Sequence, residues 1–244
     1  MHPGHVCRRL FAGLALSGLV MAAAVVGPPA AGAATAANQH YVRSLYGDLL
    51  DRSDTYADIA GMNFWANRLA THTRMEVAHG IQYSSDEYFS KIADIGYAIY
   101  LDRAADPAGR AFFVKGWMTR QFTYERLVAS LVGSSEYFRL AGSTNAGFVD
   151  KAYAEILGHE PSTSARSYFI GVAASRGRST VATLLATSHE ARTVFVEFQY
   201  GSLLGRPVDS AALKFWVDRL AGGVRREDFD VTLVSSTEYY AKNS

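Results

Sequence analysis

Cysteine is nearly absent from this chain: Cys7 is the one cysteine among 244 residues. It precedes an apolar run from Leu10 to Val26, and the basic pair Arg8-Arg9 stands directly before that run. This order is typical of an export signal, so residues 1–36 are expected to be a signal peptide and a small-residue leader. Removal of the signal takes Cys7 with it. The mature chain then has no disulfide, no thiol nucleophile and no thiolate metal site.

The position of cleavage stays open between two small-residue motifs, Ala31-Gly32-Ala33 and Ala34-Thr35-Ala36. An uncleaved membrane anchor is the alternative, because the apolar run reaches the lower edge of a spanning length. The small residues that follow the run favour cleavage. The mature protein is therefore expected to be secreted, extracellular or associated with the cell surface, and without a membrane contact.

An excess of charge of either sign is also lacking, since 24 basic residues stand against 23 acidic ones. Loss of Arg8 and Arg9 leaves 22 basic residues against the same 23 acidic ones, a net charge of about −1 with histidine neutral. A chain this balanced offers no basic footprint, so neither nucleic acid nor anionic lipid is an expected partner.

Signals for β-structure are scarce as well. Asn-Gly and Asp-Gly hairpin turns are absent, and few stretches alternate apolar with polar residues. Helical spacing is present instead: Val196, Tyr200 and Leu203 share one stripe of the final fifty residues, and Gly205 follows where a helix stop belongs. The predicted fold class is all-α.

The same pattern occurs four times, which predicts four tandem units of three to four short helices, each packed as a small bundle. A unit opens with a tyrosine-containing helix, and its second helix starts at a polar N-cap residue shortly before an aromatic pair. The expected units are residues 38–91, 92–144, 147–193 and 194–244. The expected N-caps of the second helices are Asp58, Asp106, Ser162 and Asp209.

A third landmark is a capping-box pattern, hydroxyl-x-x-Glu, ahead of the last short helix of a unit. It reads Ser84-x-x-Glu87, Thr187-x-x-Glu190 and Ser235-x-x-Glu238, and the second unit has the weaker Gly133-x-x-Glu136. Gly142 to Gly147 is the expected linker, which divides the chain into two pairs of units. Whether the units pack in a line or fold back as two lobes stays open.

These landmarks carry a resemblance to a known family. Leu-Leu-Gly-Arg, then Asp-x-x-Gly/Ala before an aromatic-Trp pair, then Ser-x-Glu-Tyr, resembles the bacterial family called domain of unknown function 4214. Members of that family carry the unit in tandem, mainly in secreted and surface proteins. Leu204 to Pro207 and Ser134 to Phe138 are similar, more loosely, to the linker domain of phycobilisome scaffolds. Both resemblances imply a compact helical module for assembly or binding, without a set of catalytic residues.

One cation follows the first helix of each unit. We expect it to cap the carbonyl groups at that helix end and to pair with the glutamate of the same unit. The alternative is a row of cations that binds anionic ligands such as teichoic acid or phosphate. The expected structural pairs are Arg52 with Glu87, Arg103 with Glu136, His159 with Glu190, and Arg206 with Glu238.

Patterns for catalysis, cofactors and metals are missing. The sequence has no His-Glu-x-x-His, no Gly-x-Ser-x-Gly elbow and no Gly-rich phosphate loop. No catalytic, cofactor-binding or metal-binding residues are therefore expected. The aromatic residues Tyr83, Trp117, Tyr124 and Tyr168 lie off the shared positions, and we expect them to form an exposed patch that stacks on sugars or binds protein.

The expected function is a non-catalytic interaction or scaffold module outside the cell, with a surface protein or an envelope glycan as its partner. Self-association is a further possibility, in the manner of phycobilisome linkers. The alternative is a small secreted hydrolase of the cell envelope. A hydrolase would need polar residues from unshared positions to converge in a cleft, with at least one strongly shifted pKa.

Overall fold

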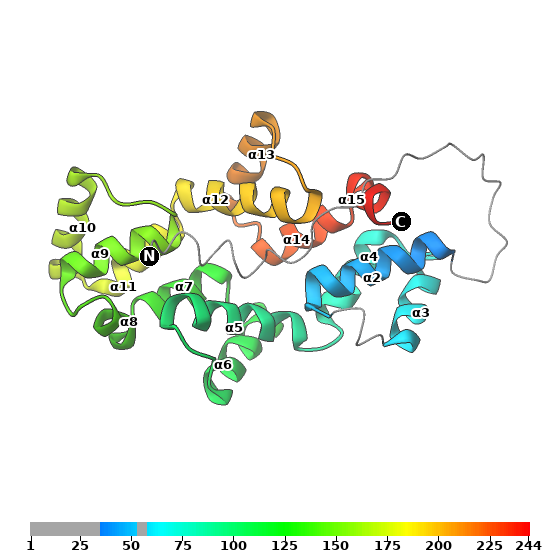
Figure 1. The fold of residues 1–244 in the computed structure, drawn as a ribbon, viewed down its shortest axis with the longest axis horizontal. Coiled ribbons are helices and arrows are strands. Elements are labelled where there is room, and N and C mark those ends of the chain that lie inside the picture. Colours follow the sequence, from blue (N-terminus) through cyan, green and yellow to red (C-terminus); the bar gives the residue numbers. More distant parts are fainter. Residues whose placement is uncertain (1–34, 53–57) are drawn as a thin grey trace.

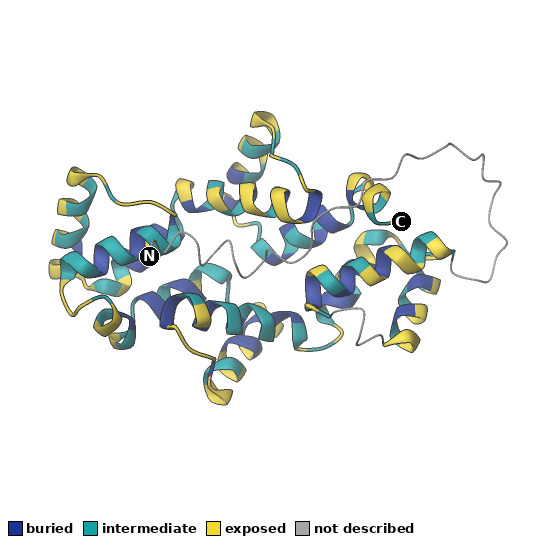
Figure 2. Ribbon diagram, in the orientation of Figure 1, coloured by how far each residue is buried: buried dark blue, intermediate teal, exposed yellow. Residues whose placement is uncertain are grey.

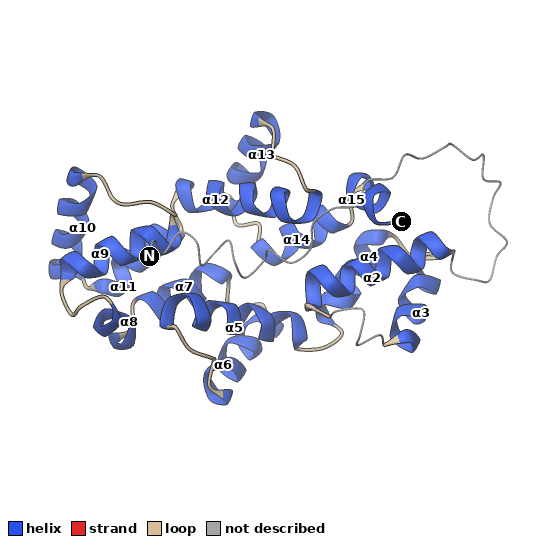
Figure 3. Ribbon diagram, in the orientation of Figure 1, coloured by secondary structure: helices blue, strands red, loops and turns tan. Residues whose placement is uncertain are grey.

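The computed structural model describes residues 35–52 and 58–244, and these ranges contain helices and no strand (Figures 1 and 3). The predicted all-α class is confirmed. The expected signal peptide lies outside the described residues, apart from Thr35 and Ala36 at the end of its range. In the described ranges no helix is long and apolar enough to cross a membrane.

Each unit contributes helices in the same order. The first helices are α2 (Ala36–Leu50), α5 (Glu87–Leu101), α9 (Asn145–Ile156) and α12 (His189–Gln199), which continues as the π-helical turn η3 (Tyr200–Leu204). The second helices are α3 (Ile59–Arg68), α6 (Pro107–Met118), α10 (Thr163–Arg176) and α13 (Ser210–Ala221). The third helices are α4 (Arg74–Tyr83), α7 (Tyr124–Val132), α11 (Arg178–Ala186) and α14 (Arg226–Val234). The short helices α8 (Ser135–Leu140) and α15 (Thr237–Asn243) end the second and fourth units.

Two of the expected unit boundaries fall inside helices. The boundary at 91/92 lies within α5, and the boundary at 193/194 lies within α12, because no glycine or proline stands beside either boundary to end the helix. The chain breaks between the second and third units, where Gly142 (φ 83°) and Ser143 (φ 57°) turn left-handed. The linker is shorter than expected, since Asn145 to Gly147 form the first turn of α9.

The second helices begin where the sequence predicts. Asp106 accepts a hydrogen bond from the backbone N–H of Gly109 (2.8 Å), and Asp58, Ser162 and Asp209 cap α3, α10 and α13 in the same way. A Cβ atom on Gly109 would lie 2.1 Å from the Tyr97 hydroxyl. The residue at the third position of the second helix is therefore small, because the tyrosine of the first helix packs onto it.

The expected capping boxes are wrong, by one residue in the last three units and by two residues in the first. Ser134, Ser188 and Ser236 are the N-caps of α8, α12 and α15, and each accepts from the backbone N–H three residues later. α5 starts after Asp86 without a side-chain cap. The glutamates thus lie at the first or second helical position, where their carboxylates face away from the cap. A full capping box forms instead at the start of α4, between Thr73 and Glu76.

The chain folds back on itself, so that the first unit packs against the fourth (Figure 1). α4 of the first unit packs against α14 of the fourth, and α7 of the second unit packs against α11 of the third. α2 also contacts α15, and the Tyr41 hydroxyl donates to the Val234 carbonyl (3.0 Å). The pairs in space are therefore one with four and two with three.

The hydrophobic core lies where the units pack against one another. The first and third helices supply most of the fully buried side chains, among them Tyr41, Phe89, Phe148 and Phe229. The second helices lie at the outer edge, each packed on the first helix of its own unit (Figure 1). Exposed residues are found on all four of these outer helices (Figure 2).

Candidate functional site

The arginine at the end of the first helix joins three helices of its unit. In the second unit, the Arg103 guanidinium donates two hydrogen bonds to the Glu136 carboxylate, at 2.6 and 2.9 Å. It also lies 4.9 Å from the centre of the Tyr97 ring and 3.5 Å from the Asp106 carboxylate. We call this arrangement the Tyr–Arg–Glu cluster. It ties the end of α5 to the starts of α6 and α8.

The first and fourth units repeat the cluster. Arg52 donates to Glu87 at 2.7 and 2.6 Å and lies 5.2 Å from the centre of the Tyr46 ring. Arg206 donates to Glu238 at 2.5 and 2.8 Å and lies 5.2 Å from the centre of the Tyr200 ring. The hydrogen bond to Glu87 raises the pKa of Arg52 above its ordinary value.

The third unit replaces the arginine with a histidine. His159 has one ring nitrogen 2.6 Å from Glu190 and the other 2.7 Å from the Glu160 carbonyl oxygen. The Glu160 carbonyl, followed by the Glu190 carboxylate, raises the pKa of His159 above its usual 6.5. The structure therefore brings all four expected pairs together.

The role of these cations differs from the expectation in one respect. Arg103 and Arg206 donate to the carbonyls of the residues that follow them, Ala104 and Pro207, rather than to carbonyls at the helix end. A left-handed residue ends each first helix instead, and these residues are Asp51, Asp102, Gly158 and Gly205. Since each arginine is already held by a carboxylate, the geometry favours a structural cluster over a row of sites for anionic ligands.

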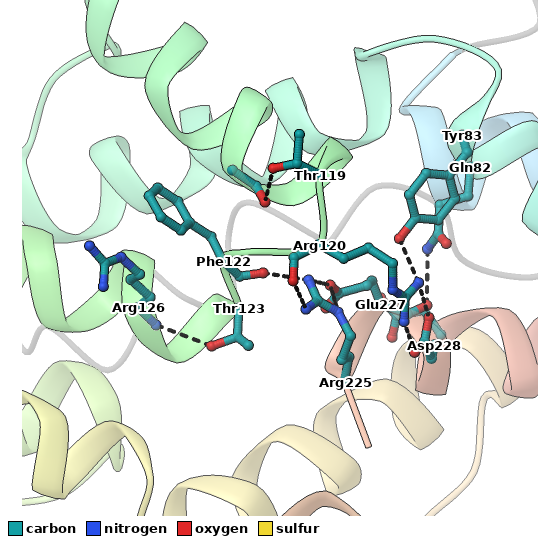
Figure 4. Close-up of polar contacts among 12 residues, drawn as sticks. Gln82, Tyr83, Thr119, Arg120, Phe122, Thr123, Arg126, Arg225, Glu227 and Asp228 are labelled. Atoms are coloured by element: carbon teal, nitrogen blue, oxygen red, sulfur yellow. Dashed lines mark hydrogen bonds and ion pairs between the residues drawn. The ribbon is translucent and has the colours of Figure 1, made fainter. Parts of the chain in front are cut away.

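A second polar cluster joins different units, and we call it the seam. It lies between α4, the loop Thr119 to Thr123 and α14 (Figure 4). Arg225 donates to the carbonyls of Arg120 (3.1 Å) and Phe122 and pairs with Glu227. Arg120 has a left-handed backbone (φ 56°). Its side chain donates to Asp228 at 2.7 Å and to the Tyr83 hydroxyl at 3.1 Å.

The seam continues inward as a group of buried and half-buried polar residues. Asp230 accepts from the Tyr88 hydroxyl (2.7 Å) and from the Gln199 side chain. Gln82 is fully buried and donates to the Glu227 carbonyl (2.9 Å), and its own Oε1 atom has no partner. Burial raises the pKa of Asp230 to about 7 and also raises the pKa of Glu227, while it lowers the pKa of Lys91.

These seam residues come from positions that the units do not share. Where α14 has Asp230, the other third helices have the apolar residues Ala78, Val128 and Ala182. Where α4 has Gln82, the others have Val132, Ala186 and Val234. The α7–α11 contact is thus apolar at both positions, and the α4–α14 contact is polar.

A shallow hollow beside α9 is the other place where carboxylates gather. It is lined by Asp150, Lys151, Glu155 and Glu160 together with small and apolar residues. Burial raises the pKa of Glu155, which accepts from Lys151 (2.5 Å) and from the Tyr137 hydroxyl (2.8 Å). Asp150 accepts two hydrogen bonds from Arg166. Both acids are therefore held by partners within the fold. In the described part of the chain no group of three or more potential ligands could hold a metal ion.

The expected aromatic patch is wrong. Trp117 is 1% exposed and stacks on Phe89 at 5.8 Å between ring centres, because it follows Phe113 by one helical turn on the core face of α6. Tyr83 accepts from Arg120, and Tyr124 lies 4.6 Å beneath the Arg226 guanidinium, so both belong to the contacts between units. Tyr168 alone is well exposed, at 59%.

Tyr168 belongs to a set that the sequence reasoning missed. It stands directly before Phe169, the aromatic residue that the units share, and the other units have a phenylalanine at the same place. All four side chains are at least half exposed. They are Phe64 (52%), Phe112 (54%), Tyr168 (59%) and Phe215 (52%). The signal was present in the sequence as the repeated aromatic pair.

Fold and clusters together define a helical repeat protein whose polar residues hold its own units in place. Two segments of the chain, residues 30–92 and 192–243, match the model of a family described as "Domain of unknown function (DUF4214)". These two segments are therefore similar to that family, and the expected resemblance is confirmed for the first and fourth units. No curated protein and no solved structure matches the chain significantly. The matched units are the two that meet at α4 and α14.

The Tyr–Arg–Glu cluster predicts a modest coupling energy. The side chains of Arg52 and Glu87 are 29% and 31% exposed, so solvent screens the pair, although two parallel hydrogen bonds strengthen it. A double-mutant cycle with Arg52→Ala and Glu87→Ala, measured by urea unfolding, should give a coupling of about 1 kcal/mol. A coupling indistinguishable from zero would contradict a structural role for the cluster.

The seam predicts a pH-dependent stability. The pKa of Asp230 is about 7 in the folded protein against 3.8 as its ordinary value, so the folded state binds the extra proton between these values. The free energy of unfolding should therefore fall as the pH rises from about 4 to about 7. Asp230→Asn should flatten this slope in urea titrations. The exposed Asp218→Asn, whose partner is Lys214, is the matched control and should leave the slope unchanged. If Asp230→Asn leaves the pH dependence of the unfolding free energy unaltered, the prediction is wrong.

Proposed function

We propose that this protein is a secreted, non-catalytic interaction module that binds a component of the cell envelope through its outer helices. The export signal expected in residues 1–36 supports the location. The main observation behind the proposal is the exposed aromatic side chain at the same place in all four units. Packing in the core does not explain why an aromatic residue recurs there, since the side chain is exposed.

The distribution of polar groups supports a non-catalytic role. The glutamates of the Tyr–Arg–Glu clusters are bound by arginine or histidine, and the seam carboxylates Glu227, Asp228 and Asp230 are each bound within the protein. A catalytic acid or base must be free to exchange a proton with its substrate, whereas each of these carboxylates is already engaged by a partner of the fold. The shifted pKa values of the seam are thus consistent with structural burial.

Binding to fractionated cell envelope tests the proposed function. The mature chain should be retained by one envelope fraction, polysaccharide or protein, and should release no soluble fragments from it. The alternative hypothesis is a hydrolase with its active site in the hollow beside α9. It predicts the release of soluble fragments, and the substitution Glu155→Gln should abolish that release. Fragment release of that kind, or no retention by either fraction, would overturn the proposal.

A further inference from the structure

The four exposed aromatic residues Phe64, Phe112, Tyr168 and Phe215 are held in one fixed geometry. Each packs edge-on against the next residue in the chain, with ring centres 5.0–5.2 Å apart and ring planes 76–80° from parallel. The second ring of each pair is buried or packed against the core, so it anchors the first. We call the four exposed rings the outer rings. Preorganised rings lose little freedom when a ligand stacks on them.

Small residues leave space beside the outer rings. One helical turn earlier, each unit has an exposed alanine or serine, namely Ala60, Ala108, Ser164 and Ala211. Long side chains on a helix lean back over the preceding turn, so a small residue there leaves space beside the ring. Phe112 has one further neighbour, since the centre of the Phe122 ring lies 5.0 Å from its own. The combination occurs in all four units.

Two outer rings have an arginine over one face. The Arg68 guanidinium lies 5.3 Å from the centre of the Phe64 ring, and that of Arg219 lies 5.4 Å from the centre of the Phe215 ring. These rings belong to the first and fourth units, the two that match the family model. A guanidinium beside an aromatic face offers hydrogen-bond donors to hydroxyl or carboxylate groups of a ligand that covers the ring.

The placement of the outer rings singly on different helices favours one class of occupant. They stand on four separate helices at the outer edge of the molecule (Figure 1). A stable protein interface buries roughly 800 Å² on each partner around a clustered apolar centre, which single, separated rings do not provide. A polysaccharide matches them, since each sugar presents a small C–H face and the polymer repeats that face.

We infer that the outer rings are four sugar-stacking sites that together bind one envelope polysaccharide. This inference rests on the proposed function and names its partner. Each site alone is weak, and attachment of one polymer at several sites raises the affinity through effective concentration. The arginines of the first and fourth units make these two sites suited to acidic sugars as well as neutral ones.

Calorimetric titration of the mature chain tests this inference with three probes: cellohexaose, the hexamer of N-acetylglucosamine, and polygalacturonate. The neutral hexamers and the acidic polymer distinguish plain stacking from stacking assisted by arginine. We expect one of them to bind and to change the fluorescence of Trp65 and Trp216, whose rings contact two outer rings. Replacement of all four outer rings by leucine should weaken binding at least about tenfold.

Leucine is the informative replacement because it keeps apolar bulk and removes the flat face. A matched control replaces four other exposed apolar residues with serine, and it should bind as tightly as the unaltered chain. These control residues are Met75, Leu140, Leu184 and Val194. Circular dichroism and thermal unfolding check that both variants are folded. If the fourfold leucine variant does not fold, variants with one outer ring replaced are used in its place.

The outcomes separate this inference from the proposed function. Unchanged polysaccharide binding in the leucine variants would overturn the inference. Retention by the envelope protein fraction alone, with no binding of any polysaccharide probe, would also overturn it and would leave the proposed function standing. Failure of every fraction and every probe to bind would overturn both.

Discussion

Contact between third helices is the interaction on which this fold depends. α4, α7, α11 and α14 have nine or ten residues each, and isolated helices of that length are marginal in water. Their stability therefore comes from the apolar faces that they bury against one another, α4 on α14 and α7 on α11. Because the α4–α14 pair joins the first unit to the fourth, the chain closes on itself rather than extending as an open stack. The second helices then lie on the outside of the molecule, where their outer rings are exposed to solvent.

The two contacts between third helices are built differently. The α7–α11 contact buries Val128 and Ala182, which need no hydrogen bonds. The α4–α14 contact buries Gln82, which donates to the Glu227 carbonyl of α14, and the half-buried Asp230 of α14 accepts from Tyr88 of α5 and Gln199 of α12. A polar contact of this kind specifies its partner more strictly than an apolar one, because a wrong register leaves buried groups unpaired. The seam thus accounts for which units pair, while the apolar faces supply most of the stabilisation.

Local features of the fold were predictable from the sequence, and contacts between units were not. Asp58, Asp106, Ser162 and Asp209 were identifiable as caps because a polar residue preceded a helical stripe. The capping boxes failed because two adjacent candidate residues precede these helices, such as Gly133-Ser134 and Ser235-Ser236, and only the backbone geometry selects the second. The pairing of units involves Gln82, whose partner Glu227 lies 145 positions away, and Asp230, whose partner Tyr88 lies 142 positions away, and neither contact has a shared sequence signal. Trp117 was misjudged although its spacing from Phe113 places both on one helix face.

The most direct test of this account is amide hydrogen exchange in the variant Tyr239→Ala. Tyr239 is fully buried in α15, its ring lies 6.0 Å from that of Tyr41, and its hydroxyl donates to Asp48 (2.6 Å). If the first and fourth units form one cooperative body, exchange should accelerate in α2 and α4 together with α14 and α15, while α9 and α11 stay protected. Acceleration confined to α14 and α15, with α2 and α4 unchanged, would contradict the claim that closure of the chain stabilises its units.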